Sequence, residues 1–219
     1  VFNIAMMEGR VSHAGLTLEQ RLVEMAHYFK PRTPRWSLWV CEDLLDQPVR
    51  RRARQIIGDF GLRAISHPPG MLASALLPPM TELPAIELQP VGAGALQRAF
   101  TEITSISFEI PFGIAQAVYA QDTAWQGQYR GFVGLAGGRP VSIVAMVRAG
   151  DALGVYSLAT HPTWRRQGYG EATMRAAVAE MVRDNGVERV VLQSTEAGYS
   201  LYKRMGFRDV TRFAVYLTK

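Results

Sequence analysis

The chain has 219 residues, of which 48% are hydrophobic and 20% charged, a composition typical of a folded globular protein and not of a disordered one. Its formal net charge of +5 suits a polyanionic partner such as a nucleotide, a nucleic acid or an acidic lipid. No stretch reaches the roughly 18 uninterrupted apolar residues of a membrane helix. The opening residues lack the order of a secretory signal, so we expect a cytoplasmic protein without a membrane partner.

The first part of the chain predicts alternating strands and helices. The expected strands are 2–6, 36–40 and 62–66, and the expected helices are 18–29 and 48–60. In the second helix, the apolar stripe consists of Val49, Ala53, Ile56, Ile57 and Phe60. The arginines at 50–52 and 54 lie opposite that stripe, and no aromatic residues alternate with them. We interpret them as a solvated helix face and expect no nucleic-acid partner.

The only cysteine, Cys41, follows an apolar run and can form neither an internal disulfide nor a thiolate metal site. We interpret it as a small packing residue, because no histidine-containing motif accompanies it. The four histidines are scattered without the spacing of metal ligands, so no metal is expected.

A proline-rich stretch follows and predicts a boundary near residues 77–85. Its prolines are 68, 69, 78, 79 and 84. Because proline lacks a backbone donor and restricts its predecessor, we expect neither a continuous helix nor a central strand here. The predicted division is a domain at 1–77, a linker at 78–85 and a domain at 86–219.

Downstream, the pattern is that of a strand at 86–91 and apolar-periodic segments from 95 to 125 that break at Pro111. Three strands are expected within 129–160, with turns at 136–138 and 149–151. The later elements are a helix that ends at Asn185–Gly186, a strand at 188–194, a helix at 196–206 and one or two strands at 207–219. The buried face predicted for the first of these helices is Met174, Ala177, Val178, Met181 and Val182.

Two segments match at a fixed offset. Residues 61–66 and 206–211 both read glycine, apolar, arginine, variable, β-branched, hydroxyl, and the offset is 206 − 61 = 145. The order of elements also agrees, so we interpret the first part of the chain as an internal repeat that lacks its opening strands. At this offset Tyr202 corresponds to Ile57.

The junction TWRRQGYGEA, residues 163–172, carries the main chemical signal. A helix that begins after a strand presents unpaired backbone N–H groups and the positive end of its dipole. Gly168 and Gly170 let an anion approach that backbone, and Arg165 and Arg166 add positive charge. The combination suits a pyrophosphate, and the alternative is a turn that happens to be glycine-rich. Neither the P-loop nor the dinucleotide-binding glycine pattern matches.

Arg165-x-x-Gly168-x-Gly170 resembles the acyl-CoA-binding motif of the GCN5-related N-acetyltransferase (GNAT) superfamily. The closing signature of that family is matched at Ala197, Leu201–Tyr202 and Gly206–Phe207. The resemblance covers 86–219 well and 1–77 loosely. It implies an α/β fold with a mixed, mostly antiparallel central sheet flanked by helices, and a partial second GNAT-like copy at the N-terminus.

The resemblance also implies roles for particular residues. The strand before the junction would splay from its neighbour and bind the pantetheine arm through Leu158, Ala159 and Thr160. The backbone N–H groups that would hold the pyrophosphate belong to Gln167, Gly168, Tyr169, Gly170 and Glu171, assisted by Arg165 and Arg166. Tyr202 would protonate the leaving thiolate. Its alternative is a core aromatic residue, and Tyr199 is the other candidate acid.

The general base is left unassigned. Glu109 lies where substrate-facing residues often occur in the family, but an exposed helix-end carboxylate fits it equally well. His161 before Pro162 is interpreted as a turn residue.

These observations predict an N-acyltransferase that moves an acetyl group from acetyl-CoA to a primary amine by direct attack. A non-catalytic acyl-CoA sensor or scaffold is the alternative, and nucleic-acid binding through the arginine-rich helix is a third hypothesis. The acceptor is not indicated, and a homodimer stays open.

Overall fold

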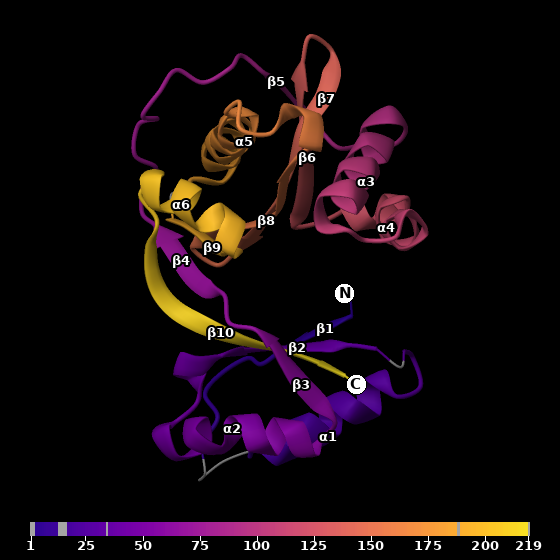
Figure 1. Ribbon diagram of the computed structural model, residues 1–219, viewed down its shortest axis with the longest axis vertical. Coiled ribbons are helices and arrows are strands. Elements are labelled where there is room, and N and C mark those ends of the chain that lie inside the picture. The colour runs from indigo at the N-terminus through magenta and orange to yellow at the C-terminus, as the bar shows by residue number, and fades with distance from the viewer. Residues whose placement is uncertain (1–2, 13–16, 34, 188, 219) are drawn as a thin grey trace. The chain divides into compact units, whose positions relative to one another are not determined.

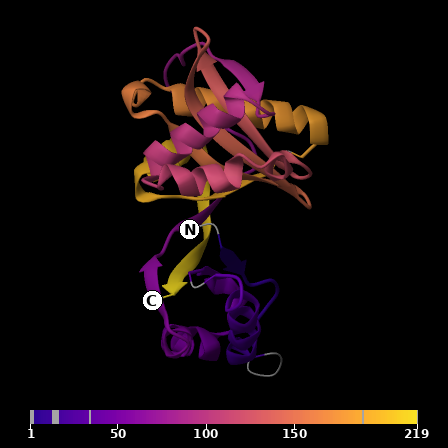
Figure 2. The same cartoon turned by 90° about the vertical axis from the view of Figure 1, so that its right-hand side faces the viewer.

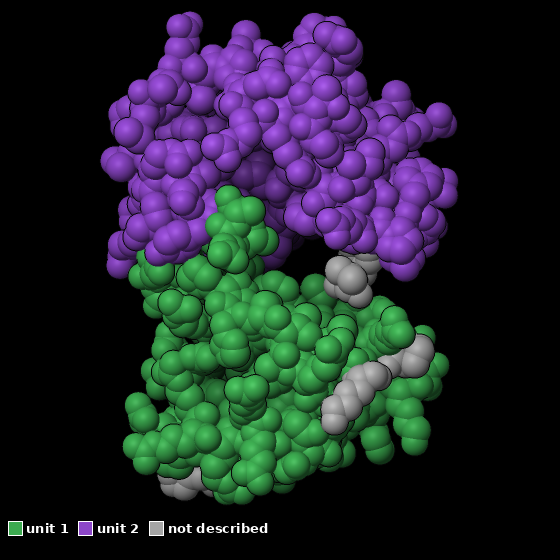
Figure 3. Space-filling view, viewed as in Figure 1, with its two compact units in different colours: residues 1–71, 193–197, 209–219 green, residues 72–192, 198–208 purple. Residues whose placement is uncertain are grey.

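The computed structural model describes residues 3–12, 17–33, 35–187 and 189–218 (Figures 1 and 2). The chain forms two compact units, coloured separately in Figure 3. Unit 1 comprises Val1–Met71, Gln193–Ala197 and Asp209–Lys219, and unit 2 comprises Leu72–Leu192 and Gly198–Arg208. Parts of three sequence-based predictions, at residues 2, 188 and 219, lie outside the described residues.

Unit 1 is a small sheet packed against two helices. Its elements are β1 (Ile4–Met6), α1 (Leu18–Phe29), β2 (Ser37–Cys41), the short 3-10 helix η1 (Glu42–Leu44), α2 (Gln47–Asp59), β3 (Leu62–Ser66), β4 (Pro69–Ala73) and β10 (Arg208–Thr218). β1 pairs with β2 in parallel, and β10 pairs antiparallel with β2 and β3. The predicted strands and helices of this part are therefore present.

The predicted stripe of α2 faces the core of unit 1 at its centre but not at its end. Ala53, Ile56 and Ile57 are buried, and Val49 packs against them. Phe60 was expected in this stripe, which is wrong: it follows the last residue of α2 as its C-cap and is 36% exposed. The helix ends before the stripe does, because Gly61 with φ of +79° turns the chain into β3.

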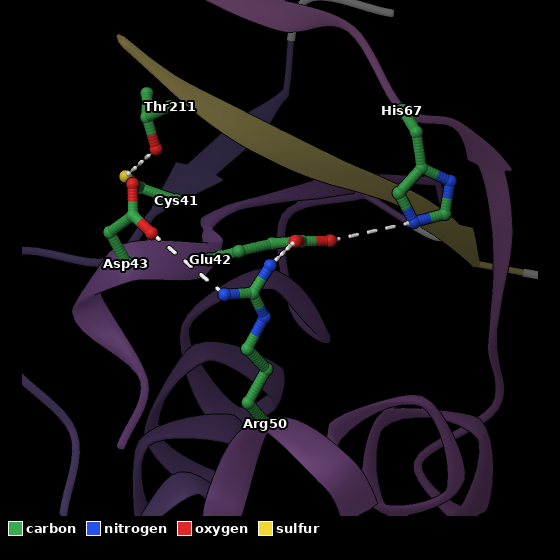
Figure 4. Close-up of polar contacts among 6 residues, drawn as sticks. All are labelled: Cys41, Glu42, Asp43, Arg50, His67 and Thr211. Carbon is green, nitrogen blue, oxygen red and sulfur yellow. Dashed lines mark hydrogen bonds and ion pairs between the residues drawn. The ribbon is translucent and has the colours of Figure 1, made fainter. Parts of the chain in front are cut away.

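A polar cluster joins the start of α2 to the preceding turn (Figure 4). The guanidinium of Arg50 pairs with the carboxylates of Glu42 and Asp43, and Nε2 of His67 lies 3.8 Å from Glu42. The thiol of Cys41 lies 3.3 Å from the hydroxyl of Thr211. Arg50 is thus engaged within the protein, and Cys41 contacts a neighbouring strand as a packing residue does.

Unit 2 holds a mixed sheet between two layers of helices (Figure 1). Its elements are β5 (Glu87–Pro90), α3 (Ala95–Phe108), α4 (Phe112–Tyr119), η2 (Asp122–Trp125), β6 (Tyr129–Ala136), β7 (Arg139–Ala149), β8 (Ala152–Thr160), η3 (Pro162–Trp164), α5 (Tyr169–Asn185), β9 (Arg189–Gln193) and α6 (Glu196–Arg204). The strand order is β9-β8-β7-β6-β5. β8 and β9 are parallel and the other neighbours antiparallel, so the predicted mixed, mostly antiparallel sheet is confirmed.

The helices of unit 2 follow the sequence pattern closely. The apolar segment breaks at Pro111 between α3 and α4, as predicted. The buried face of α5 includes Met174, Ala177, Val178 and Met181. The helix ends at Asn185, and Gly186 with φ of +64° is its C-cap. The final segment, for which one or two strands were expected, is the single strand β10.

The proline-rich stretch differs from the expectation in two ways. First, residues Pro69–Ala73 form β4, a strand that lies next to β10 within the sheet, so the expected absence of a central strand is wrong. Pro69 can occupy its first position because the ladder bond there is accepted by the Pro69 carbonyl, which receives the N–H of Ser194. Second, the following residues belong to unit 2, within which the N–H of Leu77 donates to the carbonyl of Met205.

The compact units are not continuous in sequence, unlike the predicted domains. The C-terminal strand β10 returns to unit 1, where it pairs with β2 and β3. The two segments of the predicted repeat occupy similar places, since β3 and the start of β10 each follow a helix. The glycines that precede them, Gly61 and Gly206, both have positive φ, +79° and +98°.

Candidate functional site

The end of β8 leaves its parallel neighbour. β8 pairs with β9 only from Ala152 to Gly154. On the other side, the register with β7 shifts so that Ser157 and Leu158 together oppose a single residue of β7. This bulge turns the following residues, Leu158, Ala159 and Thr160, away from the line of β9. The predicted splay is therefore present, and the β9-facing edge of these residues is not used in a ladder with β9.

Ser157 occupies the strained position of the bulge. Its φ is +50°, in the left-handed region that glycine usually fills in such bulges. For a residue with a side chain this conformation costs on the order of 1 kcal/mol or more. Neighbouring groups must compensate for this cost.

The junction after β8 presents a row of backbone donors. Gly168, with φ of +87°, is the N-cap of α5, and no side chain caps this helix. Within the described part of the chain, no backbone carbonyl accepts from the N–H groups of residues 167–171, and the first helical bond runs from Ala172 to the Gly168 carbonyl at 3.0 Å. These donors are therefore available to an anion at the positive end of the helix dipole.

In the order of elements, α1 is the helix of unit 1 that corresponds to α5. The backbone donors at its N-terminus are capped by neighbouring side chains. Thr17 caps α1 by accepting from the N–H of Gln20, and the side chain of Gln20 accepts from the N–H of Thr17. This capping box satisfies donors that α5 leaves open. The two helices thus differ in the feature that anion binding requires.

Both glycines of the junction are sites of close packing. A Cβ at Gly168 would lie 2.9 Å from Pro84 and 3.4 Å from Leu83, which belong to the proline-rich stretch. A Cβ at Gly170 would lie 2.8 Å from the hydroxyl of Thr160. Packing therefore also requires glycine at both positions. The sequence pattern alone could not distinguish this requirement from one imposed by anion binding.

The charged residues around the junction include one that the sequence analysis missed. Arg165 and Arg166 are exposed, and Nε of Arg165 donates to the carbonyl of Thr160 at 3.1 Å. The guanidinium of Arg139, at the start of β7, lies 5.0 Å from the ring centre of Trp164 in η3. Because Arg139 is far from the junction in sequence, no local motif could indicate it. Arg139 thus adds a third positive charge beside the η3 segment that leads into α5.

The carboxylate of Glu171 lies in the first turn of α5 and would oppose an anion there. It pairs with Arg175 one turn later, at 2.7 Å, and both side chains are largely buried. This pairing offsets the negative charge beside the donor row.

A buried hydroxyl pair fixes the start of α5 on the sheet. Ser142 of β7 and Thr173 of α5 are fully buried and hydrogen-bonded to each other, and the Ser142 hydroxyl also reaches the carbonyl of Tyr169 at 3.3 Å. A Cβ at Gly134 of β6 would collide with Thr173, so Gly134 makes room for this contact. Neither residue of the pair belongs to a recognised motif.

Thr173→Val is expected to lower the free energy of unfolding by about 1–2 kcal/mol, because it leaves the buried Ser142 hydroxyl without one partner at nearly unchanged volume. Urea unfolding followed by circular dichroism measures this loss. Thr123→Val, at an exposed position of η2, should change stability by less than about 0.5 kcal/mol. Equal effects of the two substitutions would contradict the assigned contact.

Tyr202 is held in α6, which follows β9. It is 9% exposed, and its ring packs edge-on against Phe207 with ring centres 5.8 Å apart. Burial raises the pKa of Tyr202 to about 12, so its hydroxyl keeps its proton throughout the neutral range. Because β8 and β9 are parallel, α5 and α6 both start at the same edge of the sheet. The other candidate, Tyr199, is half-buried, with Nζ of Lys203 5.9 Å from its ring centre.

The remaining candidates have local explanations. Glu109 is the exposed C-cap of α3 with φ of +54°, which matches the helix-end alternative. His161 precedes η3 and donates its backbone N–H to Val141, while its buried Nδ1 has no partner among the described residues. In that same part of the chain, no group of three or more His, Cys, Asp or Glu side chains is arranged to hold a metal. No helix there combines the length and apolarity needed to span a bilayer.

The splayed parallel strands and the open helix end within a mixed sheet define a class of fold, that of the GNAT acyltransferases. Residues 127–209 match the family model of the acetyltransferase (GNAT) domain. The matched segment runs from β6 to the start of β10 and includes the junction, β8 and Tyr202. A comparison with curated protein sequences gave no match.

Solved structures with this fold resemble nearly the whole chain. A GCN5-related N-acetyltransferase from Kribbella flavida has a TM-score of 0.71 at 18% identity, over 98% of this chain and 80% of that one. A GCN5-related N-acetyltransferase from Sphaerobacter thermophilus has a TM-score of 0.61 at 18% identity, over 94% of this chain and 69% of that one. A tandem GNAT protein from the clavulanic acid biosynthesis pathway has a TM-score of 0.62 at 13% identity, over 94% of this chain and 70% of that one. These likenesses show that the chain has the GNAT fold.

Proposed function

We propose that unit 2 binds acetyl-CoA and transfers its acetyl group to a primary amine. The observation that carries this proposal is the open donor row of residues 167–171 at the end of β8. In the proposal, these N–H groups hold the diphosphate, and Arg165, Arg166 and Arg139 add positive charge around it. The pantetheine arm lies along Leu158–Thr160, whose outer edge is not used by β9.

The proposed reaction is direct attack. The amine nitrogen attacks the thioester carbon, the C–S bond breaks, and the nitrogen loses a proton to solvent. Tyr202 donates its hydroxyl proton to the leaving sulfur and is reprotonated from solvent. The hydroxyl is protonated at neutral pH, because burial raises the pKa of Tyr202 to about 12, so it has a proton to donate.

We extend the proposal to the first part of the chain, residues 1–77, as a degenerate GNAT-like copy joined by the linker 78–85 to the active domain 86–219. The capping box of α1 supports this, since it uses donors that a diphosphate would need. The buried Ile57 at the position of Tyr202 supports it further, because isoleucine cannot donate a proton. A cytoplasmic location belongs to the same proposal.

The test combines binding and turnover. Calorimetry with CoA is expected to show a single site in the whole chain, and acetyl-CoA with a panel of primary amines is expected to release free thiol. Binding without thiol release on any amine would favour the acyl-CoA sensor instead. Absence of CoA binding at millimolar concentration would remove both functions.

A further inference from the structure

The bulge at Ser157 has hydroxyl partners on two other elements. The hydroxyl of Tyr119, at the end of α4, lies 3.5 Å from the hydroxyl of Ser157. Tyr129, at the start of β6, is hydrogen-bonded through its side chain to both Ser157 and Tyr119. Three hydroxyls from α4, β6 and β8 therefore meet at the one residue of β8 that has a positive φ.

A box of aromatic rings holds the two tyrosines in place. The ring centre of Trp125 lies 5.5 Å from that of Tyr119 and 5.9 Å from that of Tyr129. Phe100 packs edge-on against Tyr119, with ring centres 5.1 Å apart. The indole N–H of Trp125 also donates to the Tyr119 carbonyl at 2.9 Å. A Cβ at Gly131 would lie 2.2 Å from Trp125, so this glycine makes room for the indole.

Of the two tyrosines, Tyr119 is buried and Tyr129 is partly buried. Burial, followed by the charge of Tyr119 when ionised, raises the pKa of Tyr129 above its usual value, so its hydroxyl remains protonated. Tyr119 is 5% exposed. Two hydroxyls on packed rings can therefore restrain Ser157 in a conformation that its backbone disfavours alone.

We propose that Tyr119 and Tyr129 are positioning residues that hold Ser157 in its left-handed conformation and thereby set the direction in which residues 158–160 leave β9. The part that concerns CoA rests on the function proposed above, since these residues form the expected pantetheine edge. Neither tyrosine belongs to the two motifs of the resemblance. In this proposal both act through Ser157.

The variants remove hydroxyls with little change in shape. Tyr129→Phe and Tyr119→Phe are each expected to weaken CoA binding about fivefold, the change expected from loss of one intramolecular hydrogen bond. Amide exchange within 155–160 should accelerate by a similar factor in the protein without CoA. Tyr28→Phe, an exposed tyrosine of unit 1, is the matched control and should change neither quantity.

The decisive variant is Ser157→Gly, because glycine adopts a positive φ without restraint. In the Ser157→Gly background, Tyr129→Phe should change CoA affinity and exchange by less than about twofold, as expected when coupled residues no longer interact. An equal effect of Tyr129→Phe in both backgrounds, or unchanged exchange in the single variants, would overturn the proposal. If the wild-type protein binds no CoA, the proposed function fails. The amide exchange rates within 155–160 then still test whether the two tyrosines restrain Ser157.

Discussion

Gly168→Val is expected to weaken CoA binding by at least about 100-fold, because it disturbs several charge-assisted hydrogen bonds at once. Gly168 has φ of +87°, and a Cβ there would lie 2.9 Å from Pro84. A branched side chain disfavours this conformation and pushes on the proline-rich stretch, so the first turn of α5 must shift. Isothermal titration calorimetry with CoA measures the loss.

The control for this variant separates backbone strain from site disruption. Gly61 of unit 1 has φ of +79°, and no heavy atom lies within 4 Å of the position that a Cβ would occupy there. Gly61→Val should lower stability through the same strain while CoA affinity stays within about twofold of the wild type. If Gly168→Val unfolds cooperatively and still binds CoA with wild-type affinity, the donor row of residues 167–171 is not the diphosphate site.

Tyr202→Phe is expected to lower kcat about 100-fold, at the lower end of what a positioned general acid contributes. The KM for acetyl-CoA should stay within about twofold, because the ring and its packing on Phe207 are retained. Steady-state thiol release at saturating amine measures both constants. Tyr199→Phe is the comparison, and a loss confined to that variant would transfer the acid role to Tyr199.

The same substitution has a signature in stability at alkaline pH. The pKa of Tyr202 rises from 10.0 to about 12 on folding, so the folded state retains a proton that the unfolded state loses first. Its contribution to stability is therefore complete below pH 10 and declines between pH 10 and 12. Urea unfolding across this range should show a shallower decline for Tyr202→Phe than for the wild type.

Much of the fold was predictable because its elements are encoded locally. Pro111 divides α3 from α4, and Asn185–Gly186 ends α5, because proline and glycine act on the backbone within one or two residues. The strands of 129–160 follow from apolar runs bounded by glycine turns. β4 was missed because its one proline, Pro69, is the first residue of the strand, where the missing donor does no harm.

The candidate site likewise contains residues that local motifs indicate and residues that only the tertiary structure brings together. The sequence by itself determined the glycine junction, the arginines beside it and Tyr202, because each lies in a short motif whose spacing reflects one turn or one helix. Only the tertiary structure placed Arg139 over Trp164 and the Ser142–Thr173 pair beneath α5. It also brought Tyr119 and Tyr129 to Ser157. These contacts join residues on different elements, and they arise from strand pairing and side-chain packing, which no local pattern of residues encodes.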